Sequence, residues 1–447
     1  MVSSGKDTIF AQSSGLGVAG IAVLRCSGPQ VAAVLAVMAA PVPAPRQAAL
    51  RWILDARSGE RLDSGLVLWF PGPDSFTGED CAEFHVHGSR ATVAAVLAAL
   101  GRMDGLRPAL PGEFSMRAFK NGKLDLFEAE ALGDLIGAET EAQRRLALRL
   151  ALGGAGEVIE CWRRDIIHLL AHAEALIDFS DEEDVVTSGN ARIFLGVDTL
   201  ALSLAEAIRL SDGARLVRDG VRVVIAGPPN AGKSRLLNRI ARRDAAIVSS
   251  RPGTTRDIID VQVELGGLAV LFSDTAGIRE ATDDEIESIG IARAWSAIGD
   301  AHIILWVTAP DAEEEASPPV GMAKLVRVRN KSDLSSDGLR LIRNEMNGLS
   351  VSAETGAGVD VLLELIADMA RTMADAGDSV VFSRERQLSA ARSALIHIRN
   401  ITLSRELPVE TVAEELRAAA FQIGRISGRV DVEDLLDSIF RDFCIGK

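Results

Sequence analysis

Residues 221–240, VRVVIAGPPNAGKSRLLNRI, carry the strongest structural signal in the chain. An apolar run leads directly into Gly227-x-x-x-x-Gly232-Lys233-Ser234, and leucines at helical spacing follow. A strand, a glycine-rich loop and a helix in this order predict a phosphate-binding loop, whose backbone N–H groups surround a polyphosphate at the positive end of the helix. We expect Lys233 to neutralise the β- and γ-phosphate oxygens, and the hydroxyl of Ser234 to bind Mg²⁺.

Three later segments, in the correct order, extend this prediction. In LAVLFSDTAG, Asp274 ends a strand where a carboxylate can hold Mg²⁺ through water, and Gly277 leaves room for the γ-phosphate. In LVRVRNKSD, the carboxylate of Asp333 can accept the N1–H and N2–H₂ donors of guanine, which adenine does not offer at those positions. In LSVSAETG, the backbone of Ser352 and Ala353 can meet the guanine O6. Together the segments predict a Ras-like P-loop domain that hydrolyses GTP.

The hydrolytic mechanism must differ from that of Ras-type proteins. Ile278 follows the DTAG glycine where Ras-type enzymes carry a water-positioning glutamine, and it cannot orient water. Candidate arginines nearby are Arg251, Arg256 and Arg279, although none is an obvious arginine finger. Asn230 in the P-loop and the acidic run 283–287 are two further candidates for completing the site. For the acidic run, a solvated start of a surface helix is the alternative.

Composition is that of an ordinary globular cytosolic protein. The chain has 447 residues, of which 47% are hydrophobic and 25% charged, and it is long enough for about three domains. We expect no signal peptide and no membrane span, because the apolar stretches are short or broken by proline. The net charge of −15 argues against a broadly basic surface for nonspecific nucleic-acid binding. The four cysteines lie far apart and are expected to be reduced thiols.

The spacing of apolar residues changes along the sequence and predicts a multidomain chain that combines α/β and all-α parts. Residues 1–120 mix strand-like runs with two helical runs, which predicts an N-terminal α+β domain. Residues 121–217 and 380–447 carry long apolar patterns at helical spacing, which predicts two halves of one helical domain. Residues 218–379 alternate strand-like and helix-like segments and form the G domain inserted between these halves.

The chain resembles the MnmE (TrmE) family of tRNA modification GTPases along essentially its whole length. The resemblance rests on AGPPNAGKS, AAIVSS with GTTRD, DTAGIRE, SIGIARAW, NKSD and the terminal FCIGK, and on RPALPGEFSMRAFKNGKLDLFEAEAL in the N-terminal part. It implies a cytoplasmic homodimer that works with the flavoprotein MnmG. Together they add an aminomethyl or carboxymethylaminomethyl group at C5 of wobble uridine 34 of certain tRNAs. It also implies a tetrahydrofolate one-carbon donor, in the 5-formyl or 5,10-methylene form, bound by an N-terminal domain that also dimerises.

The resemblance also implies a GTPase activated by K⁺ when two G domains dimerise. It places Asn230, Ser249, Arg251 and Thr254 at the K⁺ site, and Thr255 beside Ser234 at the Mg²⁺ site. Glu287 matches the water-orienting glutamate of the family, and Glu285 is the runner-up because this chain has an apparent extra residue after DTAG. In the K⁺-binding loop, Pro252 departs from the commoner sequence of the family. The full set of GTP-binding residues expected from motifs and resemblance is Asn230, Ala231, Gly232, Lys233, Ser234, Arg235, Ser249, Ser250, Arg251, Pro252, Gly253, Thr254, Thr255, Asp274, Thr275, Ala276, Gly277, Asn330, Lys331, Asp333, Ser352 and Ala353.

For folate, the resemblance implies contacts from Arg25, Glu83, Lys123 and Lys447. A carboxylate such as Glu83 suits the ring N–H and NH₂ donors of a pterin, and cations suit its glutamate tail. A metal site on one strand face, from Glu83 with His85 and His87, is the competing interpretation.

Cys444, four residues from the C-terminal end of the sequence, matches a family cysteine that is needed for modification and not for GTP hydrolysis. A reactive thiol and a positioning role stay open. The alternative is a buried structural cysteine, and a prenylation box is disfavoured by Lys447 and by the lack of an upstream basic run.

Two other classes of protein compete with this interpretation. A ribosome-assembly GTPase of the Era/Der type would carry a KH-like module or a second P-loop, and neither pattern is apparent in the sequence. A folate-binding enzyme with a purely regulatory G domain would bind folate without altering the wobble uridine.

Overall fold

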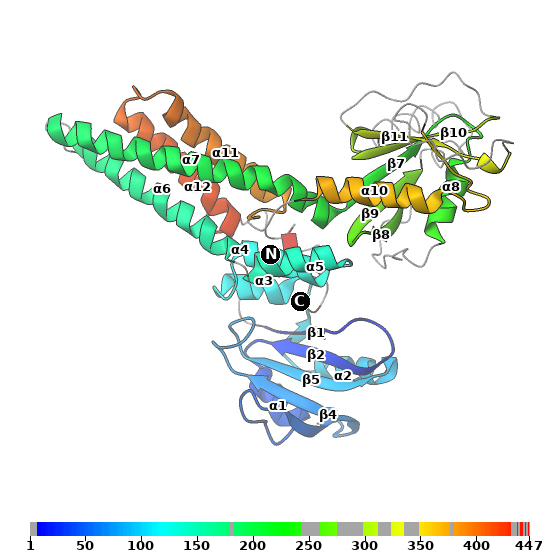
Figure 1. The fold of residues 1–447 in the computed structure, drawn as a ribbon. Helices are drawn as coiled ribbons and strands as arrows, with labels where there is room; N and C mark the ends of the chain where they lie inside the picture. The colour runs from blue at the N-terminus through cyan, green and yellow to red at the C-terminus, as the bar shows by residue number, and fades with distance from the viewer. Residues whose placement is uncertain are drawn as a thin grey trace, which may run out of the picture. The chain divides into compact units, whose positions relative to one another are not determined.

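The computed structural model describes residues 7–152, 154–178, 183–242, 260–274, 298–311, 323–334, 348–375 and 380–430, together with Leu436, Ile439, Phe440, Phe443 and Gly446. The chain forms two compact units (Figure 1). Unit 1 comprises residues 1–133 and 420–447, and unit 2 comprises residues 134–419. Each unit is described separately.

Unit 1 is built on a six-stranded sheet of order β3-β4-β5-β2-β1-β6. All neighbouring strands pair antiparallel except β1 and β6, which run parallel. The strands are β1 (Thr8–Gln12), β2 (Ala19–Ser27), β3 (Ala49–Leu54), β4 (Arg61–Phe70), β5 (Cys81–Gly88) and β6 (Leu106–Pro108). β4 begins earlier than its most apolar stretch, with the mixed residues Arg61 to Asp63, and ends directly before Pro71, which has no N–H to donate to a ladder.

Helices α1 (Val31–Met38) and α2 (Arg90–Gly101) supply the apolar partners of one face of this sheet. Ile53, Val67 and Phe84 point into that core and are fully buried. Ser89 caps α2 by accepting a hydrogen bond from the backbone N–H of Thr92, as serine at this position usually does. The strand-like runs and the two helical runs predicted within the first 120 residues are therefore present.

The C-terminal residues of the chain complete unit 1. Helix α3 (Glu113–Lys120) and the start of α4 (Leu126–Ile136) share an apolar cluster with Leu436 and Phe440. The rings of Phe440 and Phe443 meet edge to face, with centroids 5.3 Å apart. Sequence positions more than three hundred residues apart thus belong to one core.

The helical part of unit 2 consists of α5 (Glu141–Leu152), α6 (Ala155–Asp178), α7 (Glu183–Asp219), α11 (Glu385–Leu403) and most of α12 (Val409–Ser427). α7 and α11 pack side by side (Figure 1). Ion pairs join α12 to its neighbours. Arg417 pairs with Glu174 of α6 at 3.0 Å, and Glu415 pairs with His397 of α11 at 2.6 Å. The helical segments on either side of the G domain therefore pack together.

The G domain has a six-stranded sheet of order β12-β11-β10-β7-β9-β8, parallel throughout except for β8 against β9. Its strands are β7 (Val221–Ala226), β8 (Asp260–Leu265), β9 (Leu268–Asp274), β10 (Ile303–Thr308), β11 (Lys324–Arg329) and β12 (Leu349–Ser350). The described helices are α8 (Lys233–Ala241), α10 (Val359–Met373) and the short 3₁₀ turn η2 (Ser332–Leu334). This topology confirms the predicted fold class, a Ras-like domain inserted into a helical one.

Candidate functional site

The loop between β7 and α8 wraps around the ammonium group of Lys233. The Nζ atom donates hydrogen bonds to the carbonyl oxygens of Gly227 at 3.0 Å and Pro228 at 2.8 Å. Gly232 closes the loop with φ at +86°, and a Cβ there would lie 2.4 Å from the amide nitrogen of Asn330. Glycine is therefore required at this position both for its backbone conformation and for space. The loop has the form that the sequence predicts for binding phosphates.

Ser234 and Asp274 meet at the end of the central strands. The hydroxyl of Ser234 donates to Oδ2 of Asp274 at 2.6 Å. Asp274 is buried at the end of β9, which pairs with β7 in a register that sets Asp274 opposite Ile225. A hydroxyl and a carboxylate oxygen are ligand types that Mg²⁺ prefers, so these two residues fit the predicted metal site.

Asn330 joins the phosphate-binding loop to the predicted guanine-binding loop. Its side chain is buried, with Nδ2 donating to the carbonyl of Ala231 at 2.9 Å and Oδ1 accepting the N–H of Ala353 at 3.0 Å. Asp333 accepts a hydrogen bond from Ser352 at 2.5 Å through Oδ1. The four segments that the sequence singled out are thus brought to one edge of the sheet.

Several predicted residues of the G domain lie outside the described residues. They are Ser249, Ser250, Arg251, Pro252, Gly253, Thr254, Thr255, Thr275, Ala276, Gly277 and Glu287, as well as the runner-up Glu285. Among those described, Asn230 is exposed in a left-handed conformation with φ at +62°. Arg235 is exposed and lies 3.8 Å from Glu354, while Lys331 pairs with Asp311 at 2.6 Å.

A second set of predicted residues gathers in unit 1. Arg25, Glu83 and Lys123 line one cavity of about 470 Å³. Oε1 of Glu83 accepts hydrogen bonds from Nε and Nη2 of Arg25 at 3.1 and 2.8 Å. Burial raises the pKa of Glu83, but the hydrogen bonds and charge of Arg25, with help from His85, outweigh burial and hold this pKa below its usual value. The carboxylate is therefore ionised at neutral pH and can accept hydrogen bonds.

The cavity also has residues that the sequence did not point to: Arg46, Phe70, Asp74, Ser75, Phe76 and Cys81. The guanidinium of Arg25 lies over the ring of Phe76, 5.2 Å from its centroid. Cys81 pairs with Phe70 across β5 and β4. It lies two residues before Glu83 on β5 and so on the same sheet face, and this alternation could have identified it from the sequence. Arg46 and Phe76 lie in loops, where no periodic pattern marks them.

Buried ion pairs hold the loop that forms one wall of this cavity. Arg117, with 8% of its side chain exposed, donates from Nη1 to Oε2 of Glu79 at 3.0 Å and from Nη2 to Oε1 of Glu113 at 3.1 Å. Glu79 also accepts a hydrogen bond from Ser27 at 2.7 Å. The loop between β4 and β5 is therefore attached to both α3 and the sheet.

The competing metal interpretation gains no support from the geometry. His87 turns to Asp63, with Nδ1 2.8 Å from Oδ1, and Glu83 pairs with Arg25. His85 remains near Glu83, at 3.3 Å. Within the parts of the chain that the structure describes, no group of three or more metal-ligating side chains occurs.

Gly446, near the C-terminal end of the sequence, contacts the residue that follows β1 of the same sheet. The carbonyl oxygen of Gly446 accepts a hydrogen bond from the hydroxyl of Ser13 at 2.9 Å. Ser13 directly follows Gln12, the last residue of β1, and the preceding residue Ala11 pairs with Arg25 of β2. Cys444 and Lys447 themselves lie outside the described residues.

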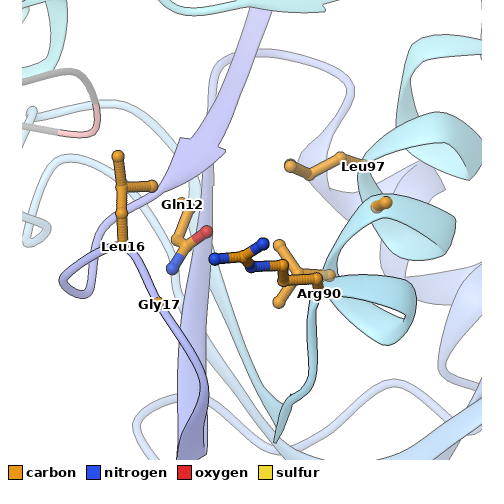
Figure 2. Close-up of a pocket in the computed structure, with 7 residues that line it drawn as sticks. Gln12, Leu16, Gly17, Arg90 and Leu97 are labelled. Carbon is orange, nitrogen blue, oxygen red and sulfur yellow. The ribbon is translucent and has the colours of Figure 1, made fainter.

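A second cavity of unit 1, of about 360 Å³, contains none of the predicted site residues. Figure 2 shows the side chains of Gln12 and Arg90 pointing toward each other in it. The remaining lining consists of Leu16, Gly17, Val93, Ala94 and Leu97.

Comparison with known proteins identifies the family. A sequence model of the GTP-binding protein TrmE N-terminus matches residues 8–123, and one of the MnmE helical domain matches residues 126–444. The chain belongs to the MnmE family. One MnmE relative, the tRNA modification GTPase MnmE of Methylobacterium sp. (strain 4-46), is 48% identical over 449 residues, 99% of this chain and 100% of that protein. MnmE of Bradyrhizobium sp. (strain ORS 278) is 46% identical over 98% of this chain and 99% of that protein.

MnmE membership confirms the predicted resemblance and the predicted enzyme class. The chain is a GTPase, a class of enzyme that binds GTP and Mg²⁺. None of the helices in the described ranges has the length and apolar character needed to cross a membrane.

Proposed function

We propose that this chain, together with the flavoprotein MnmG, adds an aminomethyl or carboxymethylaminomethyl group at C5 of wobble uridine 34 of certain tRNAs. The observation that carries the proposal is the cavity lined by Arg25, Glu83 and Lys123, in a chain that also holds a P-loop domain. The family name and the relatives named tRNA modification GTPase support the same assignment. A cytoplasmic location follows from this role.

The cavity in unit 1 is proposed to bind a tetrahydrofolate. The ionised carboxylate of Glu83 suits a pterin ring, whose N–H and NH₂ groups are donors, and aromatic walls suit its flat faces. When bound, this cofactor supplies the one-carbon unit, and at the methylene level the transfer is redox-neutral because the uridine and an amine each give up one hydrogen. Arg25, Glu83 and Lys123, with Lys447, are the proposed contacts.

GTP hydrolysis is proposed to depend on K⁺ and on Glu287. Ile278 cannot position water, so a cation at the P-loop and a carboxylate from the acidic run are proposed to replace the usual glutamine and arginine. Asn230 is exposed in the P-loop, where its side-chain carbonyl can bind a cation. The remaining proposed K⁺ residues are Ser249, Arg251 and Thr254, and Thr255 joins Ser234 at Mg²⁺.

A homodimer is proposed, with one contact through unit 1. Leu50 and Leu66 pair across β3 and β4, and together with Trp52 they lie on the sheet face opposite the buried Ile53 and Val67. Leu50 is 67% exposed and Trp52 is 50% exposed. Apolar side chains gathered on one face in this way are typical of association surfaces. Dimerisation of the G domains is the second proposed contact.

The first experiment compares GTP hydrolysis by the purified protein in matched KCl and NaCl buffers. A strong preference for K⁺ supports the proposed cation site, and equal rates in both salts contradict it. Glu287→Ala and Glu285→Ala variants then identify the water-orienting carboxylate. The correct variant loses hydrolysis and keeps GTP affinity, while its neighbour remains active.

The second experiment separates tRNA modification from a purely regulatory role of the G domain. A bacterial strain lacking its own MnmE is complemented with this chain, and wobble nucleosides are measured by mass spectrometry. Restored modification supports the proposal. The opposite outcome is that the purified protein binds folate but the wobble uridine stays unmodified, in a strain that expresses the chain in soluble form and has its own MnmG. That outcome favours a folate-binding enzyme with a regulatory G domain.

A further inference from the structure

The cavity of unit 1 has two ends that differ in electrostatic character. At one end, Arg25 is neutralised by Glu83 through two hydrogen bonds, and its guanidinium lies 5.2 Å from the ring centroid of Phe76 and 5.9 Å from that of Phe114. Both partners are partly buried, with 22% and 18% of their side chains exposed. This end is electrically balanced and suits a neutral heterocycle with donor groups.

The other end carries two cations around Asp74. Arg46 donates to the backbone carbonyl of Asp74, and its guanidinium lies 6.0 Å from the ring centroid of Phe70. Nζ of Lys123 lies 4.0 Å from the carboxylate of Asp74, which is 82% exposed. An ion pair of this length and exposure is weak. Among the described residues, no carboxylate lies within ion-pair distance of Arg46.

The backbone of Arg46, whose side chain lines the cavity, is fixed by a hydrogen bond. Its N–H donates to the carbonyl of Trp69 at 2.8 Å, which ties it to the end of β4 beside Phe70. The residue adopts φ at +60°, a conformation that residues with a Cβ rarely take. Arg46 is thus held at the exposed end, where an elongated ligand would leave the cavity.

The geometry points to Arg46 as the residue that binds the extended, γ-linked glutamate tail of a polyglutamylated folate. The inference rests on the proposed folate site and assigns a specificity role within it. Each added glutamate brings one more carboxylate, and Arg46 offers a planar, bidentate donor for it. Lys123, as a single point charge, is left for a carboxylate of the first glutamate.

The test compares tetrahydrofolates with one and with three glutamates, titrated into the wild-type full chain and an Arg46→Gln variant. The wild type is expected to bind the triglutamate more tightly than the monoglutamate. In Arg46→Gln the triglutamate affinity is expected to fall about three- to fivefold, the range of an exposed charge pair, with little change for the monoglutamate. Glutamine removes the charge and keeps a Cβ and a polar N–H donor at this position.

Two further variants make the result specific. Arg61→Gln removes another exposed guanidinium, which lies over the ring of Trp52 at 4.3 Å and does not line the cavity, and it should leave both affinities unchanged. Arg46→Lys keeps the charge and should restore part of the triglutamate preference.

Four results would contradict the inference or the proposed site. Equal loss for both ligands, or no loss for either, overturns the role of Arg46 in reading tail length. If the triglutamate affinity of Arg61→Gln falls as much as that of Arg46→Gln, the effect is one of overall charge, and the role of Arg46 is again overturned. Absence of binding of any tetrahydrofolate to the wild-type chain instead refutes the proposed folate site itself.

Discussion

The hydroxyl of Ser234 donates a hydrogen bond across 2.6 Å to the carboxylate of Asp274, a residue forty positions later in the chain. The contact joins the first turn of α8 to the end of β9, because β7 and β9 are parallel neighbours whose ends lie together. Two oxygen ligands of the proposed Mg²⁺ site therefore hold each other in place.

Replacing Ser234 with alanine should weaken binding of Mg·GTP. The variant loses both a ligand and the donor that orients Asp274, and a hydrogen bond to a charged group is worth roughly 1.5–3 kcal/mol. We expect affinity to fall about ten- to a hundredfold, measured with a fluorescent GTP analogue at several Mg²⁺ concentrations. Ser211→Ala, in the buried interior of α7, is the control and should bind GTP normally. Unchanged Mg²⁺ dependence in Ser234→Ala would contradict the assignment.

Replacing Asp333 with asparagine should change the preferred nucleotide from GTP to xanthosine triphosphate. Ser352 donates to Oδ1 of Asp333, so the asparagine keeps its oxygen toward Ser352 and turns its NH₂ group toward the base. That donor opposes the NH₂ of guanine and matches the carbonyl at C2 of xanthine. We expect GTP affinity to fall about a hundredfold or more, because the site loses an acceptor and gains a mismatched donor. Competition binding with both nucleotides measures this affinity, and Asp368→Asn, at an exposed position of α10, is the control.

Replacing Gly446 with alanine should uncouple the tail from the sheet. A Cβ there would lie 2.1 Å from the carbonyl oxygen of Gln12, and φ at +95° already disfavours a side chain. We expect wobble modification to fall at least about tenfold while GTP hydrolysis stays within about twofold of wild type, since the proposed P-loop site is distant in sequence and in a different unit. Gly156→Ala, where a Cβ meets nothing within 4 Å, is the matched control. Full modification by Gly446→Ala would show that the tail position is unimportant.

Asp125 should make unit 1 less stable as pH rises through the mildly acidic range. Burial, with the nearby Glu128, raises the pKa of this carboxyl from 3.8 to about 6, against the opposing effect of backbone hydrogen bonds and Arg429. The unfolded chain releases this proton at lower pH than the folded chain does, so the contribution of Asp125 to stability decreases between about pH 4 and pH 6.

Asp125→Asn removes this dependence and keeps the acceptor for the N–H of Glu128. The variant should melt at nearly the same temperature as the wild type at pH 4, and about 2–4 °C above it at pH 7. Carboxyls with a lowered pKa, such as Glu113 and Glu83, contribute less to stability as pH falls. They are present in both proteins, so their contributions cancel in the difference of the two melting temperatures. A difference that does not vary with pH would refute the assignment.

The nucleotide framework was predictable because its residues follow parallel strands. The carboxyl ends of parallel strands meet at one edge, so Ser234, Asp274 and Asn330 had to converge once the strands were recognised. The positioning role of Asn330 between Ala231 and Ala353 was not predictable, because it depends on side-chain packing between loops.

The cavity of unit 1 was predictable only through the resemblance. Antiparallel strands and loops bring its lining together, and Arg46 lies in a loop that carries no periodic signal. The ion pair of Arg117 with Glu79 likewise joins two segments whose spacing in the sequence follows no rule, whereas Glu113 lies one helical turn before Arg117 on α3. Such contacts are set by the three-dimensional packing and cannot be derived from local pattern.

The position of Leu436 and Phe440 has a consequence for synthesis on the ribosome. They complete a core whose other members, Met116, Leu126 and Ala129, are translated far earlier, and residues 134–419 are made in between. Helices α3 and α4 therefore keep an apolar surface uncovered while the residues of the second unit are being synthesised. During that interval the chain is open to chaperones and to aggregation, so slow or stalled translation of the later segment should harm the N-terminal unit first.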